Sequence, residues 1–150
     1  MVKPVFPGGV FDGAQHLYAV RVYYEDTDLS GITYHANYLR WFERARSDLL
    51  RMLKIDQREA IEAGEGAYAV SEINLKYLRP AKLDDDVVIE TTCTELGAAS
   101  CRMHQRAMRG DELLCEASLR VGFISLDGRP RRQPAEWRTA FANFMEDNLE

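Results

Sequence analysis

The feature that most constrains the fold of this chain is one helical segment with apolar side chains around much of its circumference. Over residues 36–53 a main apolar stripe follows the helical period, and further apolar residues widen it. The stripe comprises Tyr38, Phe42, Ala45, Leu49 and Met52, widened by Leu39, Trp41 and Leu53. A helix with so broad an apolar surface has to be covered by other parts of the chain. The rest of the chain is therefore predicted to enclose it.

Nearly everything after this helix has the character of β-strand. Strand-like runs are expected over 67–78, 87–96, 100–108 and 113–125, separated by turn residues, and another precedes the helix at 17–24. Short turns between the later runs imply antiparallel pairing. The order predicts an α+β fold, in which an antiparallel five-stranded sheet curls around one long central helix.

The length of 150 residues suits one domain with one core, predicted to span 1–150. Residues 1–15 are expected to be a flexible N-terminal arm, because they carry proline and glycine and little apolar pattern. A short helix is predicted to start at Asp56 and to end at Gly64. Apolar residues on one helical face predict a C-terminal helix over 134–148.

Composition excludes several classes of protein. The formal net charge of -5 argues against a general nucleic-acid binder, whose surface is usually basic. No apolar run approaches the ~20 residues needed to span a bilayer, and the N-terminus lacks the apolar core of a signal peptide, so a cytoplasmic location is expected. The three cysteines are an odd count without close pairing, which favours free, buried thiols over a disulfide framework.

Chemistry is concentrated in residues 25–38, between the first strand and the helix. This stretch holds Glu25, Asp26 and Asp28 together with a glycine and His35. A carboxylate loop that leads onto a helix N-terminus places an acid or base beside oriented backbone N–H groups. Such an arrangement suits attack on a carbonyl carbon and stabilisation of its oxygen. Two other readings stay open here: Asp28 as a turn residue, and a metal site at the two alternating aspartates.

The same region carries a pattern of many residues at fixed spacing. The pattern consists of Tyr23 to Asp28, Gly31, Tyr34, His35, Asn37, Tyr38, Phe42, Glu43 and Arg46. It resembles the signature of the hotdog-fold acyl-CoA thioesterases, and most of all the YbgC-like branch of the 4-hydroxybenzoyl-CoA thioesterase family. Residues 78–85 resemble that branch's link between strands, and the resemblance covers roughly 17–125.

The resemblance implies roles for individual residues. Asp28 matches the catalytic carboxylate, acting as nucleophile or general base, and His35 matches the residue whose backbone N–H meets the thioester carbonyl. The implied substrate-binding residues are Gly31, Tyr34, Tyr38 and Ser100. Asp26 is expected to hold the loop. No metal or separate cofactor is implied, because coenzyme A (CoA) is part of the substrate.

The resemblance also implies an assembly and a partner. Members of the family are homodimers that join two sheets into one, often paired again as homotetramers, with active sites at the dimer interface. The phosphates of CoA call for basic residues, and the candidates are Lys76, Arg79, Arg102, Arg106, Arg129, Arg131 and Arg132. The 4-hydroxybenzoyl enzyme has a basic cluster at the turn matching 97–99, where this chain has no basic residue.

Three alternatives to this assignment stay open, one for the catalytic residue and two for the function. Glu43 is the rival carboxylate, since another hotdog branch places its catalytic glutamate on this helix, although pairing with an arginine is its favoured role. The alternative function is a non-catalytic protein that binds acyl-CoA or acyl carrier protein, as a scaffold of the envelope or phospholipid-synthesis machinery. A dehydratase of the same fold is a third possibility, but its motif is missing.

Overall fold

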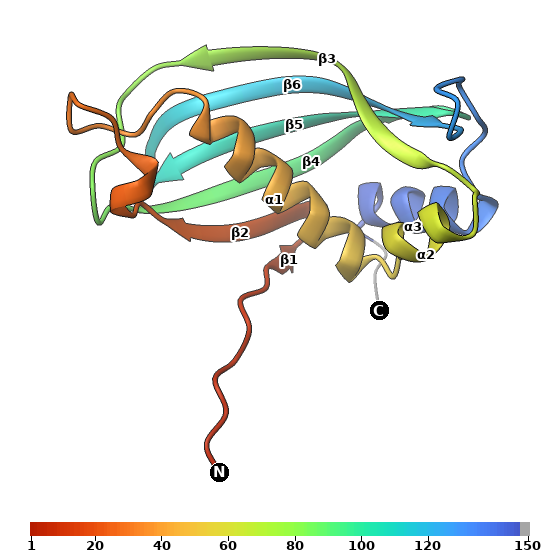
Figure 1. Cartoon of the computed structure of the whole chain (residues 1–150), viewed down its shortest axis with the longest axis horizontal. Coiled ribbons are helices and arrows are strands. Elements are labelled where there is room, and N and C mark those ends of the chain that lie inside the picture. The colour runs from red at the N-terminus through yellow and green to blue at the C-terminus, as the bar shows by residue number, and fades with distance from the viewer. Residues whose placement is uncertain (148–150) are drawn as a thin grey trace.

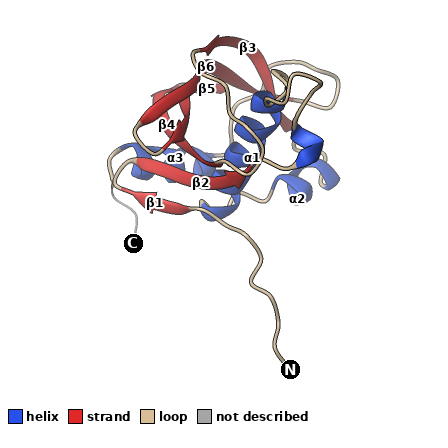
Figure 2. Cartoon of the chain, turned by 90° about the vertical axis from the view of Figure 1, so that its left-hand side faces the viewer, coloured by secondary structure: helices blue, strands red, loops and turns tan. Residues whose placement is uncertain are grey.

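The strand-forming runs assemble into one antiparallel sheet of six strands in the order β1-β2-β4-β5-β6-β3. The structure is a computed structural model, and it describes residues 1–147. The strands are β1 (Val10–Asp12), β2 (Gln15–Arg21), β3 (Ala67–Tyr77), β4 (Asp86–Leu96), β5 (Ser100–Arg109) and β6 (Glu112–Ile124). The sheet curves around a long helix, α1 (Asn37–Met52), as Figures 1 and 2 show. The predicted α+β class and antiparallel sheet are confirmed.

The sheet has six strands, so the predicted number of five is wrong. The additional strand is β1, which pairs with β2 through a tight turn in which Gly13 has a φ of +63°. Three residues are too few to display an alternating pattern, so this strand could not be predicted from the sequence. The predicted N-terminal arm thus includes β1, while residues 1–8 are exposed.

Helix α1 is accompanied by shorter helices. A 3-10 helix (Tyr24–Asp26), which was not predicted, precedes α1, and α2 (Gln57–Glu62), which corresponds to the short helix predicted from Asp56, and α3 (Ala135–Met145) follow it. Helix α3 corresponds to the predicted C-terminal helix over 134–148, of which position 148 lies outside the described residues. No helix within residues 1–147 combines the length and apolar character needed to cross a membrane.

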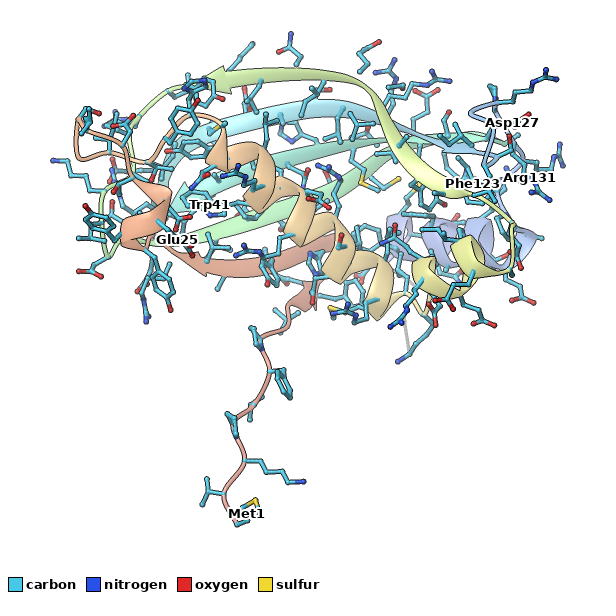
Figure 3. All side chains as sticks on the ribbon, in the orientation of Figure 1. Met1, Glu25, Trp41, Phe123, Asp127 and Arg131 are labelled. Atoms are coloured by element: carbon cyan, nitrogen blue, oxygen red, sulfur yellow. The ribbon has the colours of Figure 1, made fainter. Side chains whose placement is uncertain are left out.

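The apolar face of α1 supplies the centre of the core. Trp41, Phe42, Ala45 and Leu49 are each at most 1% exposed, and the helix lies against β2 and β4. Figure 3 shows Trp41 directed toward the sheet. Each large apolar side chain buried in this way stabilises the fold by about 1.5–3 kcal/mol. The broad stripe read from the sequence is therefore what fixes the helix inside the curved sheet.

The edge strand β3 is less well covered than the rest of the sheet. A bulge between Val70 and Glu72 shifts its register against β6, and inward-facing side chains continue on both sides of it. Because α1 packs against β2 and β4, away from the β3 edge of the sheet, Val70 is 44%, Ile73 37% and Tyr77 47% exposed. A strip of apolar surface therefore runs along β3 beside the helix.

The three cysteines, Cys93, Cys101 and Cys115, are free and buried within the sheet, as predicted. Burial raises the pKa of the Cys115 thiol to about 12. A buried thiol with a raised pKa is a poor nucleophile, since the thiolate is the reactive form. Cys115 therefore acts as a small apolar core residue.

Candidate active site

The carboxylate loop folds as a tight hairpin in front of α1. Thr27 and Thr33 form an isolated antiparallel bridge. Asp28 N–H donates to Ile32 O at 3.1 Å, and Gly31 N–H donates to Asp28 O at 3.0 Å. Gly31 has a φ of +81°, a conformation that glycine adopts without strain. The hairpin places Asp28 at a defined position on an exposed loop.

Asp26 fastens this loop to the start of the helix. Its two carboxylate oxygens accept hydrogen bonds from Asn37 Nδ2 and from Tyr23 N–H, both at 2.8 Å. Its backbone oxygen accepts from Tyr34 N–H, also at 2.8 Å. The structural role expected for Asp26 is thereby confirmed.

Asp28 carries an exposed carboxylate that stays ionised. Its Oδ1 accepts hydrogen bonds from the hydroxyl of Ser30 and from Ser30 N–H, the latter at 2.8 Å. These two bonds, with a smaller contribution from the charge of His35, hold the pKa of Asp28 below its ordinary value. The group is thus a carboxylate throughout the neutral range, and it lies near the imidazole at the beginning of α1.

The N-terminus of α1 leaves backbone donors free. The N-cap residue, Ala36, has no side chain able to cap the helix. The backbone N–H groups of His35 and Ala36 donate no hydrogen bond to any group within residues 1–147. Because the helix dipole adds partial positive charge at this end, these amides form a site for a developing negative charge.

A cavity of about 330 Å³ opens next to these amides. It is lined by Ile32, Thr33, His35, Tyr38, Tyr77, Leu78, Arg79 and Pro80. The Tyr77 hydroxyl donates to His35 O at 2.7 Å, which holds the backbone at the start of the helix in place. Tyr38 OH accepts a hydrogen bond from Ala81 N–H at 3.2 Å and so ties the helix to the link after β3.

The structure brings some of the predicted site residues to this cavity and leaves others outside it. His35 and Tyr38 line the cavity, whereas Asp28, Gly31 and Tyr34 lie on the adjoining segment without lining it. Tyr34 remains in contact with the site through its ring, whose centre is 4.6 Å from that of His35. Ser100 begins β5, at the end of that strand farthest from Arg109 and the link, so it does not join the group within one chain.

Tyr77 is a site residue that the sequence reasoning missed. It is the last residue of β3 and immediately precedes the link over 78–85, which the family pattern already included. The sequence contained one indication of this role, because Tyr77 directly precedes the link. Tyr77 and His35 are 42 positions apart in the sequence, and their contact is visible only in the folded structure.

The rival carboxylate, Glu43, lies at a different cavity. A space of about 140 Å³ between α1 and the sheet is lined by Glu43 and Arg46 together with mainly apolar residues. The guanidinium of Arg46 donates to Gln105 Oε1 at 2.9 Å. Within residues 1–147 Glu43 forms no ion pair, so the expected pairing with an arginine is not present as a direct contact.

Known proteins are similar to this chain over most of its length. Residues 30–116 match the family model described as the thioesterase superfamily. The chain is 40% identical over 125 residues to the acyl-CoA thioesterase YbgC of Haemophilus influenzae, covering 83% of this chain and 92% of that protein. It is 39% identical over 117 residues to the acyl-CoA thioester hydrolase YbgC of Escherichia coli O157:H7, covering 77% and 87%.

A solved structure shows the same fold. The probable thioesterase from Bartonella henselae superposes with a TM-score of 0.76 at 34% identity, covering 80% of this chain and 99% of that one. The start of α1 falls within residues 30–116, the range matched by the family model, and Asp28 lies two residues before that range.

Proposed function

This chain belongs to the thioesterase superfamily and is a thioester hydrolase, and we propose that it cleaves acyl-CoA with the Asp28 carboxylate as the catalytic group. The observation that carries this proposal is the placement of an ionised carboxylate on the same short segment as the free amides of His35 and Ala36. Relatives described as acyl-CoA thioesterases, at about 40% identity over most of the chain, support the choice of substrate.

In the mechanism we propose, the thioester carbonyl oxygen is held by the amides at the start of α1. As a general base, Asp28 takes a proton from water while the water oxygen bonds to the carbonyl carbon. The C–S bond then breaks, and the departing thiolate takes up the proton, giving a free acid and CoA. As a nucleophile, Asp28 instead forms an acyl anhydride that water hydrolyses in a second step.

The two routes make different predictions for a single turnover in ¹⁸O-labelled water. The base route places the label in the released acid, whereas hydrolysis of an anhydride by attack on the Asp28 carbonyl places it in the protein. Mass spectrometry of the peptide that contains Asp28 separates them.

The first test of the assignment is the substitution Asp28→Asn. It preserves size while removing the negative charge, and we expect kcat to fall by about 100-fold or more, as is usual when a catalytic base is lost. Thiol release from a panel of acyl-CoA substrates is the measurement. Asp127→Asn is the matched control, because it changes an exposed loop aspartate at the opposite end of the sheet from Glu25 (Figure 3). A folded Asp28→Asn protein with wild-type turnover would refute the catalytic role.

We propose that the active form is a homodimer or homotetramer built on the β3 edge. The edge strand β3 has eleven residues and pairs with β6 on one side only, so its outer side presents free backbone groups to another strand. Its apolar strip is also partly exposed in one chain. A second copy covering this edge would also complete the cavities beside α1, and it would bring the partner's Ser100 within the same assembly. Light scattering should give two or four times the 17.2 kDa chain mass, and a stable monomer would contradict the proposal.

The free, buried cysteines support a cytoplasmic location for this enzyme, where thiols are kept reduced. Delivery of the acyl group by acyl carrier protein is a second route to the same cavity. It can be tested by replacing acyl-CoA with an acyl carrier protein thioester in the same assay.

A further inference from the structure

The peptide group between His35 and Ala36 is held at one end and free at the other. Its carbonyl oxygen, His35 O, accepts a hydrogen bond from the Tyr77 hydroxyl at 2.7 Å. Its N–H, which belongs to Ala36, donates no hydrogen bond within residues 1–147. The C=O and N–H of a trans peptide lie in one plane and point in opposite directions. The bond from Tyr77 therefore also fixes the direction of the free N–H.

The preceding peptide group, between Tyr34 and His35, is held in a different way. Its carbonyl oxygen, Tyr34 O, accepts a hydrogen bond from Asn37 N–H at 2.9 Å, which lies in the first turn of the helix. The direction of the free His35 N–H is thus set by local folding of the chain. The direction of the Ala36 N–H depends instead on a side chain that is 42 positions from His35.

Tyr77 is held firmly enough to position the group that it contacts. Its backbone lies in β3 opposite Cys115 of β6. The next residue, Leu78, donates its N–H to Leu114 O at 2.9 Å, so the end of the strand stays attached to the sheet. The ring of Tyr77 meets that of Tyr38 edge-on, with 5.6 Å between the ring centres. The hydroxyl is therefore placed by the sheet and not by the loop that it contacts.

The hydroxyl of Tyr77 stays a donor throughout the neutral range. Burial raises the pKa of Tyr77 above its ordinary value, so the phenol is protonated while Asp28 is ionised. A hydrogen bond accepted by the carbonyl oxygen of an amide polarises that amide and strengthens its N–H as a donor. The contact with His35 O thus directs the Ala36 N–H and makes it a better donor.

We propose that Tyr77 is a positioning residue for the reaction, and that it makes the Ala36 N–H a second donor to the oxyanion beside the His35 N–H. This inference rests on the proposed function and deepens it, because the family resemblance implies the N–H of His35 alone. Negative charge develops on the thioester oxygen only as the carbonyl carbon is attacked. A well-directed donor therefore stabilises the transition state more than the bound substrate.

The test is the substitution Tyr77→Phe, which removes the hydroxyl and keeps the ring. Tyr77 is 47% exposed, so the variant is expected to fold. Tyr18→Phe is the matched control, because Tyr18 lies on β2 and its hydroxyl donates no hydrogen bond within residues 1–147. Thiol release from one acyl-CoA gives kcat and KM for each protein, and circular dichroism verifies the fold.

We expect kcat to fall about tenfold in Tyr77→Phe, which is less than the 100-fold or more that follows the loss of a whole oxyanion donor. KM should stay at the wild-type value, because equal losses in kcat and kcat/KM identify an interaction made only in the transition state. Tyr18→Phe should match wild type in both constants. A wild-type kcat in Tyr77→Phe, or a loss that appears mainly as a rise in KM, would overturn the positioning role.

An infrared measurement reports on the donors directly. An acyl-CoA analogue in which a methylene group replaces the sulfur keeps the carbonyl but has no thiol to lose, and its carbonyl can be labelled with ¹³C. Hydrogen bonds to the carbonyl oxygen lower its stretching frequency. We expect binding to lower this frequency less in Tyr77→Phe than in wild type or Tyr18→Phe, and an equal shift in all three would overturn the second donor. A wild-type protein that releases no thiol from acyl-CoA would instead overturn the proposed function.

Discussion

The buried pair of Asp48 and His16 offers a quantitative test of what holds the N-terminal segment onto the central helix. Asp48 lies on α1 and is 8% exposed. Its Oδ2 lies 2.7 Å from His16 Nε2 and accepts a hydrogen bond from Gly9 N–H at 2.9 Å. His16 is fully buried, and its other ring nitrogen has no partner within residues 1–147. The Asp48 carboxylate therefore binds both His16 on β2 and Gly9, the residue that precedes β1.

The substitution Asp48→Ala removes both contacts. A buried polar nitrogen left without a partner costs about 2 kcal/mol, and loss of the partly buried bond to Gly9 adds about 1 kcal/mol. The free energy of unfolding should fall by about 3 kcal/mol, which for a chain of this size lowers the melting temperature by about 6–12 °C. Urea and thermal unfolding followed by circular dichroism, at one fixed protein concentration, measure both quantities.

Two companion variants sharpen this experiment. Asp48→Asn keeps an oxygen acceptor and should lose less stability than the alanine variant. Ser47→Ala alters the adjacent position on α1 without removing an observed side-chain hydrogen bond, and should stay within about 0.5 kcal/mol of wild type. If Asp48→Ala also falls within that interval, the argument that this carboxylate anchors the segment is refuted.

Two further predictions concern pH and backbone conformation. Burial lowers the pKa of His16, with Asp48 acting in the opposite direction, so the unfolded chain binds more protons below pH 6.5. The contribution of His16 to the free energy of unfolding should be complete above pH 6.5, and it should decline as the pH falls from 6.5 toward the pKa of the folded state. Melting curves measured between pH 7.5 and 5 test this expectation. Gly66 has a φ of +140°, and an added Cβ would lie 2.4 Å from Ile124 O, so Gly66→Ala should cost about 1–3 kcal/mol; an unfolding midpoint equal to wild type would disprove the clash.

Features set by local sequence were predicted well. The helical period around Trp41 and Leu49 identified α1 to within a residue or so at each end. Asp56 caps α2 by accepting from Glu59 N–H at 3.0 Å, and Gly64 has a φ of +75°, as expected of residues that begin and end a short helix. In each case the cause lies within a few positions of the residue concerned.

Features that depend on distant pairing were not predictable in the same way. The cavity beside His35 exists because the end of β3 returns to the start of α1, and no local pattern records that approach. The same holds for a neighbouring cavity of about 410 Å³, where Arg109 at the end of β5 meets Asp85 on the link before β4. Sequence reasoning named candidate basic residues by type, whereas only the fold reveals which of them lie beside a cavity.

The bulge in β3 has a consequence for tolerance of length changes. Ser71 is the residue without a counterpart on β6, since Val70 is opposite Val121 and Glu72 is opposite Arg120. A chain shortened by deletion of Ser71 would pair regularly and keep Ile73 and Tyr77 turned inward, losing only the local bend. An insertion that forced a one-residue slip would rotate the distal half of the strand outward and carry the Tyr77 hydroxyl away from His35. Among homologous chains with this site, we therefore expect deletions at the position of Ser71 and no insertions there.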